Sequence, residues 1–236
     1  MTAEQARIPL NPSPKPDGDA VLACEAVLFD CDGVLVDSTA AGEYAWTQWA
    51  TEYGLEPSRV LDGVHGRRSV ETVALFIAAE RRVEALARIE AIEIAGATRC
   101  AALPGAAGLI ATFPSNRHWA IVTSASRALL SARLRAAGLP LPPVLITGED
   151  VTRGKPAPDG YRMAAQRLGA PVTESVVIED SLAGVQAGRA AGVRHVIGVG
   201  EQALQFAAQP VVTDLSGIRW TGTSLRFDGA SITRLR

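Results

Sequence analysis

Through the second half of the chain, short apolar runs alternate with segments of helical character. The runs fit buried strands at 120–123, 144–146, 175–178, 195–199 and 210–213, and the segments between them fit helices at 127–137, 161–168 and 182–191. Strands that are separated by single helices pair in parallel through right-handed crossovers. With one earlier apolar run at 24–30, this pattern predicts an α/β fold with a doubly wound parallel sheet.

A helical block interrupts this pattern directly after its first strand. From 39 to 101 the composition is helical and no alternating strand pattern occurs, and Pro104-Gly105 marks the end of the block. We therefore predict an inserted α-helical cap domain at 39–102, and a core made of 23–38 and 103–236. The predicted cap helices are 43–53 and 69–97.

The two ends of the chain carry weaker signals. Residues 1–22 contain four prolines and little to bury, which predicts a disordered tail. Near the other end, the sequence Phe-Asp-Gly-Ala at 227–230 fits the turn of a terminal hairpin within 220–236. Neither end suggests a function.

Composition and charge exclude several classes of partner. The chain has 23 basic and 25 acidic residues and a net charge of −2, evenly spread, so we expect no nucleic-acid partner. It has neither a polybasic stretch nor an apolar run of about 18 residues, so we expect no membrane association. No secretion signal opens the sequence, and three cysteines without metal-ligand spacing fit a reducing cytosol. We expect a cytoplasmic monomer or weak homo-oligomer.

A nine-residue segment, Asp-Cys-Asp-Gly-Val-Leu-Val-Asp-Ser from Asp30 to Ser38, follows the apolar run at 26–29. A strand that ends in two carboxylates places both at the carboxyl edge of the sheet, where open α/β folds hold their ligands. Asp30 and Asp32 repel each other there, and a divalent cation would compensate them. An acidic turn after a strand is the alternative. Cys31 is a poor nucleophile candidate because strand alternation turns it away from both carboxylates.

Three further features follow later core strands. Ser124-Ala125-Ser126 opens a helix whose free N–H groups suit a phosphate, although simple N-capping fits as well. Lys155 lies in the stiff sequence Gly-Lys-Pro-Ala-Pro and would offset gathered negative charge, unless it is an ordinary surface lysine. The pair Glu179-Asp180 is typical of Mg²⁺ ligands or of a helix N-cap. All of them fall at one edge of the predicted sheet.

On these residues, and on the segment Ile-Glu-Asp-Ser-Leu-Ala-Gly-Val-Gln-Ala-Gly at 178–188, the chain resembles the haloacid dehalogenase-like superfamily. Specifically, it resembles the phosphatase branch with a helical cap inserted after the first strand. The resemblance covers about 24–215. It implies that Asp30 is the nucleophile that forms an aspartyl-phosphate, and that Asp32 is the general acid and then the base.

The resemblance also implies the binding roles. Mg²⁺ would be held by Asp30, the backbone carbonyl of Asp32 and Asp180, with Glu179 acting through water. Lys155 would orient the nucleophile and neutralise charge. The phosphoryl oxygens would be bound by the hydroxyl of Ser124 and the N–H of Ala125. Thr123 is the other possible source of the hydroxyl.

Substrate choice would belong to the cap. In the stretch 64–69, His65, Arg67 and Arg68 are candidates to face an anionic, polyol-bearing substrate, while an exposed helix start with Ser69 as N-cap is the alternative. The His-Gly-Arg-Arg stretch is similar to that of small-sugar and polyol phosphatases of this branch. We therefore expect a small phosphorylated metabolite as the substrate.

Other reactions of the superfamily fit the residues less well. β-Phosphoglucomutase-type mutases carry a histidine soon after the nucleophile motif, where this chain has Ala41-Gly42-Glu43. Dehalogenases do not use the second aspartate, and phosphonate cleavage needs a cap lysine, which 39–101 lack. A phosphoryl-accepting receiver or a catalytically silent relative is the non-enzymatic alternative. The retained acids and Lys155 favour a Mg²⁺-dependent phosphomonoesterase, with the mutase as the second candidate.

Overall fold

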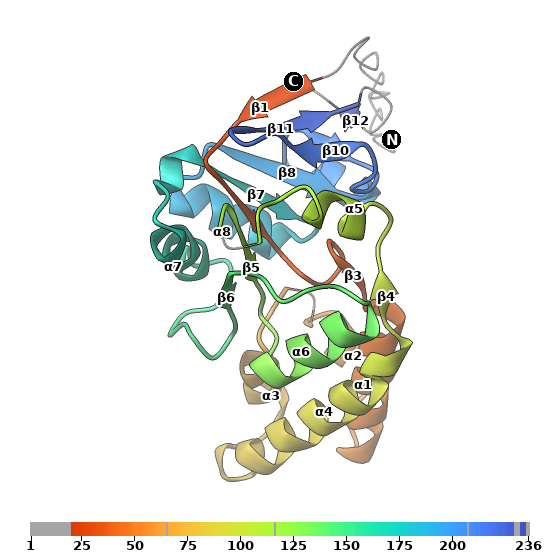
Figure 1. Ribbon diagram of the computed structural model, residues 1–236. Helices are drawn as coiled ribbons and strands as arrows, with labels where there is room; N and C mark the ends of the chain where they lie inside the picture. The colour runs from red at the N-terminus through yellow and green to blue at the C-terminus, as the bar shows by residue number, and fades with distance from the viewer. Residues whose placement is uncertain (1–19, 65, 116, 207, 229–231, 235–236) are drawn as a thin grey trace, which may run out of the picture.

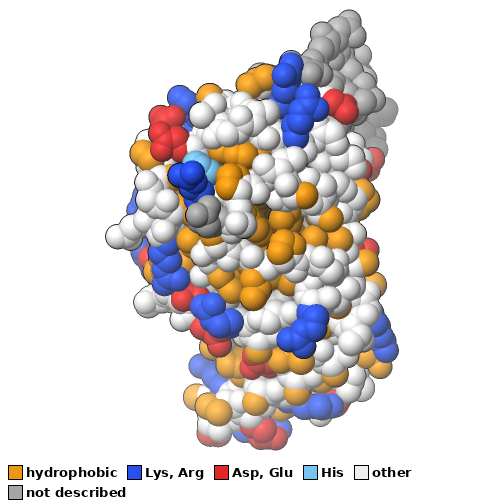
Figure 2. All heavy atoms as spheres, in the orientation of Figure 1, with side chains coloured by type: hydrophobic (Ala, Val, Ile, Leu, Met, Phe, Trp, Pro, Cys, Tyr) orange, Lys and Arg blue, Asp and Glu red, His pale blue; other side chains and the backbone are white. Residues whose placement is uncertain are grey.

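The computed structural model describes residues 20–236, apart from 65, 116, 207, 229–231 and 235–236. The chain forms an α/β core and a helical domain that extends from one end of the core (Figure 1). Basic and acidic side chains are interspersed from the core to the helical domain on the face drawn in Figure 2. Within the described residues, every helix is too short or too polar to cross a membrane.

A seven-stranded sheet forms the centre of the core, in the order β12-β9-β8-β7-β2-β5-β6. Its strands run parallel except for β12, an edge strand that pairs antiparallel with β9. The predicted doubly wound parallel sheet is therefore confirmed, with an added antiparallel edge. The strands are β2 Ala26–Phe29, β5 Trp119–Val122, β6 Val144–Ile146, β7 Ser175–Glu179, β8 His195–Val199, β9 Val211–Val212 and β12 Ile232–Arg234.

Helices cover both faces of this sheet because its strands are apolar on both sides. Successive strand residues point to opposite faces. Val27 and Phe29 pack in the cluster that includes α5 and α6, whereas Leu28 packs with α7 and α8. The core helices are α5 Ala106–Ile110, α6 Arg127–Ala136, α7 Asp159–Leu168 and α8 Leu182–Ala191, with 3-10 turns η3 Val172–Glu174 and η4 Glu201–Gln205.

The cap has its own hydrophobic core, centred on Trp49. The indole is fully buried, and its N–H donates to the carbonyl of Ala85 at 2.9 Å. The chain leaves the core through β3 Val36–Asp37 and re-enters through β4 Ala101–Ala102, and these two strands pair antiparallel. The cap helices are α1 Thr39–Glu52, α2 Pro57–Leu61, α3 Ser69–Phe76 and α4 Arg82–Gly96, with 3-10 turns η1 Ala79–Arg81 and η2 Ala97–Arg99.

The segment predicted as one helix over 69–97 is two helices. Ile77 has an extended backbone (φ −115°, ψ 133°), so α3 ends and the chain turns before α4 begins. The guanidinium of Arg82 caps the end of α3 by donating to the carbonyls of Ala74 and Ile77, at 3.0 and 2.9 Å. This break lets α3 and α4 both contribute to the apolar centre of the cap.

Both predictions for the ends of the chain need correction. Residues 20–22, assigned to the tail, lie in β1 Ala20–Ala23, which pairs with β11 Ser224–Phe227. The terminal hairpin joins β10 Ile218–Trp220 to β11 and turns at 221–223, not at 227–230. The strand continues through Phe227 because this ring is fully buried, while Gly222 (φ 99°) supplies the turn. Residues 1–19 and 229–231 lie outside the described part of the chain.

Candidate active site

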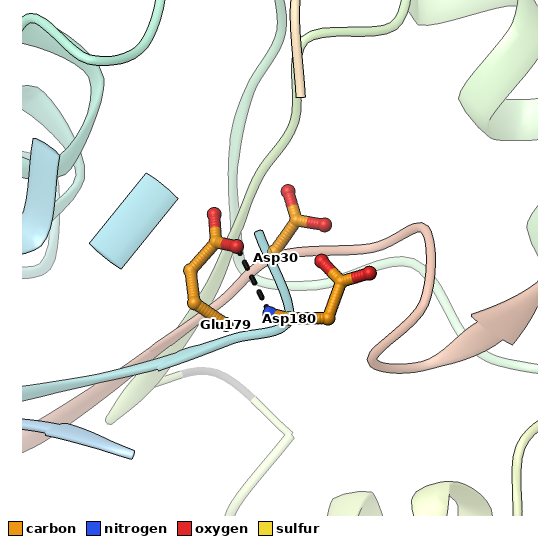
Figure 3. A group of neighbouring side chains, drawn as sticks. All are labelled: Asp30, Glu179 and Asp180. Atoms are coloured by element: carbon orange, nitrogen blue, oxygen red, sulfur yellow. Dashed lines mark hydrogen bonds between the residues drawn. The ribbon is translucent and has the colours of Figure 1, made fainter. Parts of the chain in front are cut away.

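Three carboxylates meet at the carboxyl edge of the sheet, as the sequence predicts. Phe29 of β2 is paired with Ile178 of β7, so the residues that follow, Asp30 and Glu179, lie side by side. With Asp180 they bring one oxygen each to within 4.8 Å of one another. Figure 3 shows the three side chains turned toward a common space.

Lys155 is the cation of this group. Its Nζ forms ion pairs with Oδ1 of Asp30 and, at 2.5 Å, with Oε1 of Glu179. One ammonium cannot neutralise three acids, of which Asp30 and Glu179 are buried and Asp180 is half-buried. Burial raises the pKa of Asp30 to about 7, the Glu179 and Asp32 carboxylates act in the same direction, and Lys155 opposes them. Burial, with the carboxylates of Glu179, Asp30 and Asp32, holds the pKa of Asp180 well above its usual range.

Glu179 is held as a fixed anion behind the site. Its Oε1 also accepts the hydroxyl of Tyr161 at 2.8 Å, and its Oε2 accepts three hydrogen bonds at 3.0 Å: the backbone N–H groups of Asp180 and Ser181 and the hydroxyl of Ser181. Burial acts to raise its pKa, but Lys155 and these hydrogen bonds keep the pKa below its usual range. Gly184 leaves the space for it, since a Cβ there would lie 1.6 Å from Oε1.

The donor set fits a hard divalent cation. Asp30 and Asp180 line the cavity, and oxygen ligands of this kind are those that Mg²⁺ prefers. Burial is the main cause of the raised pKa values of both groups, and neighbouring carboxylates add to it, so a cation bound between them would favour their ionised forms. Asp30 and Asp180 would hold the ion directly. Glu179 has both oxygens engaged in hydrogen bonds and suits a role through water.

Asp32 is positioned by two partners. Its Oδ1 accepts the hydroxyl of Ser38 at 2.7 Å, and its Oδ2 accepts Nη1 of Arg133 at 2.9 Å. Arg133, on α6, is 6% exposed, and its Nη2 donates to Oε1 of Glu93, on α4 of the cap, at 3.1 Å. One guanidinium thus bridges the predicted general acid and a carboxylate of the cap.

The sequence-based prediction missed Arg133 and Glu93. A signal for Arg133 was present, because it follows Leu130 and Leu129 by three and four residues and so lies on the apolar face of its helix. Its pairing with Asp32 spans 101 positions of the chain and depends on how α6 packs against the loop after β2. Nothing in the sequence of α4 distinguishes Glu93 from the other acids of that helix.

The two hydroxyls after β5 have different surroundings. Thr123 is buried, and its Oγ1 accepts the N–H of Ala125 at 3.1 Å. Ser124 is half-buried, and its hydroxyl donates to the carbonyl of Gly66 in the cap at 2.9 Å. Ser124 is therefore the more accessible hydroxyl. The N–H of Ala125, a predicted phosphoryl ligand, is engaged by Thr123 in this structure.

The structure separates the two cap arginines. Arg67 is exposed and lines the cavity that contains Asp30. Arg68 turns to the core instead, where it donates to the carbonyls of Val151 and Thr152 at 2.9 and 3.1 Å, so the structure does not bring it to the candidate site. Helix α3 begins at Ser69 with Arg68 as its N-cap residue, not with Ser69 in that place. His65 lies outside the described residues.

The cavity between cap and core has a volume of about 140 Å³. Its core side carries the groups expected to handle a phosphate, and its cap side combines polar and charged groups with the apolar side chains of Trp46 and Val64. A space of this size suits a small solute. The core side is lined by Asp30, Asp32, Gly33, Ser38, Thr123, Ser124, Ala125, Leu129, Arg133, Asp180 and Ser181, and the cap side by Thr39, Gly42, Glu43, Trp46, Val64, Gly66, Arg67, Ser69 and Glu93.

Truncation of the neighbouring arginines should have different consequences. Arg67→Ala is expected to raise KM severalfold without changing the melting temperature, because this side chain lines the cavity but holds no described element in place. Arg68→Ala should lower the melting temperature by a few degrees, because it removes hydrogen bonds between cap and core. Kinetics and thermal melting of the pair check this. An unchanged KM in Arg67→Ala would show that Arg67 is a surface residue that does not bind the substrate.

Mg²⁺ should stabilise the protein more at high pH than at low pH. The folded-state pKa values of Asp30 and Asp180 are raised above those of the unfolded chain. In the metal-free protein the contribution of Asp30 to stability is therefore present below about pH 4 and is lost as the pH rises through about 7, and the contribution of Asp180 is likewise lost as the pH rises. A bound cation would offset the repulsion between these carboxylates once they are ionised at high pH. Melting with Mg²⁺ and with EDTA at about pH 5.5 and about pH 8 measures the difference.

We expect Mg²⁺ to raise the melting temperature by several degrees at the higher pH and by less at the lower pH. In Asp180→Asn the two increases should become equal. Equal gains at both pH values would contradict the assignment of the cation to these acids.

Comparison with known proteins identifies the family. A sequence profile of haloacid dehalogenase-like hydrolases matches residues 24–192. Hexitol phosphatase A from Escherichia coli is 44% identical over 182 residues, covering 75% of this chain and 84% of that protein. 2-Deoxyglucose-6-phosphate phosphatase 1 from Saccharomyces cerevisiae is 34% identical over 196 residues, covering 73% of this chain and 79% of that protein. The structure of CbbY from Rhodobacter sphaeroides with phosphate has a TM-score of 0.71 at 26% identity, covering 85% of this chain and 99% of that one.

The profile match spans the cap and every strand-end acid described above. The resemblance drawn from the sequence motifs is thereby confirmed, as is the enzymatic class that it implied. The chain belongs to the haloacid dehalogenase-like hydrolases, in the branch of phosphatases that carry an inserted helical cap.

Proposed function

We propose that this protein is a Mg²⁺-dependent phosphomonoesterase that hydrolyses a small sugar or polyol phosphate through an aspartyl-phosphate. The observation that carries the proposal is that Asp30 lines one cavity with Asp32 and Asp180 and is ion-paired with Lys155. Two relatives support the substrate class, since one is named a hexitol phosphatase and the other a 2-deoxyglucose-6-phosphate phosphatase.

In the first step, a carboxylate oxygen of Asp30 forms a bond to phosphorus while the ester P–O bond breaks. Asp32 gives its proton to the departing alkoxide oxygen, so the leaving group departs as an alcohol. Lys155 keeps the nucleophile in place through its ion pair and offsets the charge gathered around it. When bound, Mg²⁺ would supply further compensation of the phosphoryl charge.

In the second step, Asp32 takes a proton from water, whose oxygen attacks phosphorus and displaces the Asp30 carboxylate. Phosphate is released and both acids return to their starting states. Ser38 and Arg133 hold Asp32 by one oxygen each, which fixes the direction of its carboxyl group toward the cavity. The hydroxyl of Ser124 lines the same cavity and would suit a phosphoryl oxygen once it is released from the carbonyl of Gly66.

Three features support the remaining parts of the proposal. The cavity has walls from both domains, so closure of the cap over it would exclude bulk water during the reaction. Cys24, Cys31 and Cys100 are buried free thiols, which fits a reducing cytosol. The net charge of −2 would not attract nucleic acid, which is itself negatively charged.

A phosphosugar mutase of the β-phosphoglucomutase type is the alternative. Two observations favour hydrolysis over it. The stretch expected to carry a hinge histidine contributes Gly42 and Glu43 to the cavity, and no histidine is among the described residues that line the cavity. The named relatives above are phosphatases.

The deciding experiment is phosphate release with Mg²⁺ from a panel of sugar, polyol and glycolate phosphates that includes β-glucose 1-phosphate. Efficient release from one or two small sugar or polyol phosphates would support the proposal and name the substrate class. Conversion of β-glucose 1-phosphate to glucose 6-phosphate with a bisphosphate primer, without release of phosphate, would overturn it in favour of the mutase.

A further inference from the structure

Glu93 is a buried carboxylate in the wall of the catalytic cavity that the proposed reaction does not use. It lies on α4 of the cap and is 8% exposed. Its Oε1 accepts Nη2 of Arg133 at 3.1 Å, and the hydroxyl of Ser69 is a further hydrogen-bond partner. Burying this acid costs free energy, because a charged carboxylate loses its hydration on burial.

The hydrogen-bond chain from Asp32 locates Glu93 within the cavity. Arg133 donates to Asp32 through Nη1 and to Glu93 through Nη2, so the two carboxylates are separated by one guanidinium group. A general acid must lie next to the ester oxygen of the leaving group. Glu93 therefore lies one guanidinium group away from the proposed general acid, in the cap wall of the cavity that the leaving group would occupy.

The charge of this region limits what Glu93 can contact. Arg133 is shared between two carboxylates, so it balances Glu93 when Asp32 is protonated, as the first step requires, and the trio of Asp32, Arg133 and Glu93 carries one excess negative charge when both acids are ionised. In neither state does the trio leave a cation free for a second anionic group of the substrate. A carboxylate instead binds hydroxyl groups well, since it accepts hydrogen bonds with both oxygens.

Resting on the proposed function, we propose that Glu93 is the specificity residue that binds the hydroxyl groups of the leaving polyol and excludes leaving groups that carry a second anion. The apolar neighbours Trp46 and Leu129 line the same cavity and would pack against the carbon chain between the hydroxyls. Substrates that combine one phosphate with neutral hydroxyls satisfy both requirements.

The test compares three substrates with three-carbon chains and one larger polyol phosphate. Glycerol 1-phosphate and sorbitol 6-phosphate carry hydroxyls, propyl phosphate has none, and 3-phosphoglycerate adds a carboxylate. The variant is Glu93→Gln, and the control is Glu90→Gln, which alters another cap carboxylate of α4 that bonds Ser126 of the core and does not line this cavity. For each protein, kcat/KM is measured on all four substrates, together with the melting temperature.

In Glu93→Gln, the preference for the hydroxylated substrates over propyl phosphate should fall about tenfold or more, mainly through KM, and the discrimination against 3-phosphoglycerate should weaken. Glu90→Gln should keep both ratios. Equal losses on all substrates would overturn the inference, since Glu93 would then act through Arg133 and Asp32 alone. If Glu93→Gln does not fold, Glu93→Asp, which withdraws the oxygens by one methylene, must show the same change in ratios. A wild-type protein that hydrolyses none of the four substrates would refute the proposed phosphatase instead.

Discussion

Asp30→Asn is expected to abolish phosphate release, with a loss in kcat on the order of 10⁴ or more. An amide cannot form the acyl-phosphate, so the covalent route is closed. The substitution also removes one of the two carboxylates that Lys155 pairs with, although the pair with Glu179 remains. Phosphate release is measured under single-turnover conditions, and trapped phosphoenzyme is sought by mass spectrometry of the wild type.

The matched control is Asp62→Asn, which changes an exposed aspartate of the cap that does not line the cavity. It should retain the activity of the wild type. Thermal melting in EDTA at about pH 8 should show that Asp30→Asn is folded, because it relieves repulsion among the buried carboxylates. Retention of more than a small fraction of activity in Asp30→Asn would refute Asp30 as the nucleophile.

Asp32→Asn is expected to slow both half-reactions, with a loss in kcat of roughly 10²- to 10⁴-fold. The amide can neither protonate the leaving alkoxide nor accept a proton from water. Mg²⁺ affinity should persist, because the proposed ligand at this position is the backbone carbonyl, while the side chain bonds to Ser38 and Arg133. Rapid-quench kinetics separates the two half-reactions, and calorimetry measures Mg²⁺ binding.

Ser38→Ala provides the comparison for this result. It removes one hydrogen bond to Asp32 and keeps the carboxyl group, so the loss in kcat should be far smaller, near tenfold. If Asp32→Asn abolished Mg²⁺ binding, the carboxylate and not the carbonyl would be the ligand. A loss no larger than that of Ser38→Ala would refute Asp32 as the general acid and base.

Local signals predicted the core elements closely. Helix α8 begins and ends where expected, at Leu182 and Ala191, because the Ser181 hydroxyl accepts the N–H of Gly184 and Gly192 adopts a left-handed backbone (φ 85°). The single helix predicted over 69–97 was wrong, because the chain leaves the helical conformation at Ile77 and the carbonyls at the end of α3 are satisfied by the Arg82 side chain. The helical composition of this segment gives no sign of that contact. The terminal sheet was missed for a similar reason, since β1 pairs with a strand about 200 positions away.

The sequence by itself determined which edge of the sheet carries Asp30, Asp180 and Lys155, because parallel strands place their carboxyl ends together whatever the cap does. Only the tertiary structure decided how side chains from different domains meet in the cavity. The bridge from Asp32 through Arg133 to Glu93, and the turn of Arg68 away from the site, depend on how the cap packs on the core. The positions of strands and helices along the chain follow from local patterns of backbone and polarity, whereas these contacts follow from shape, which no local pattern encodes.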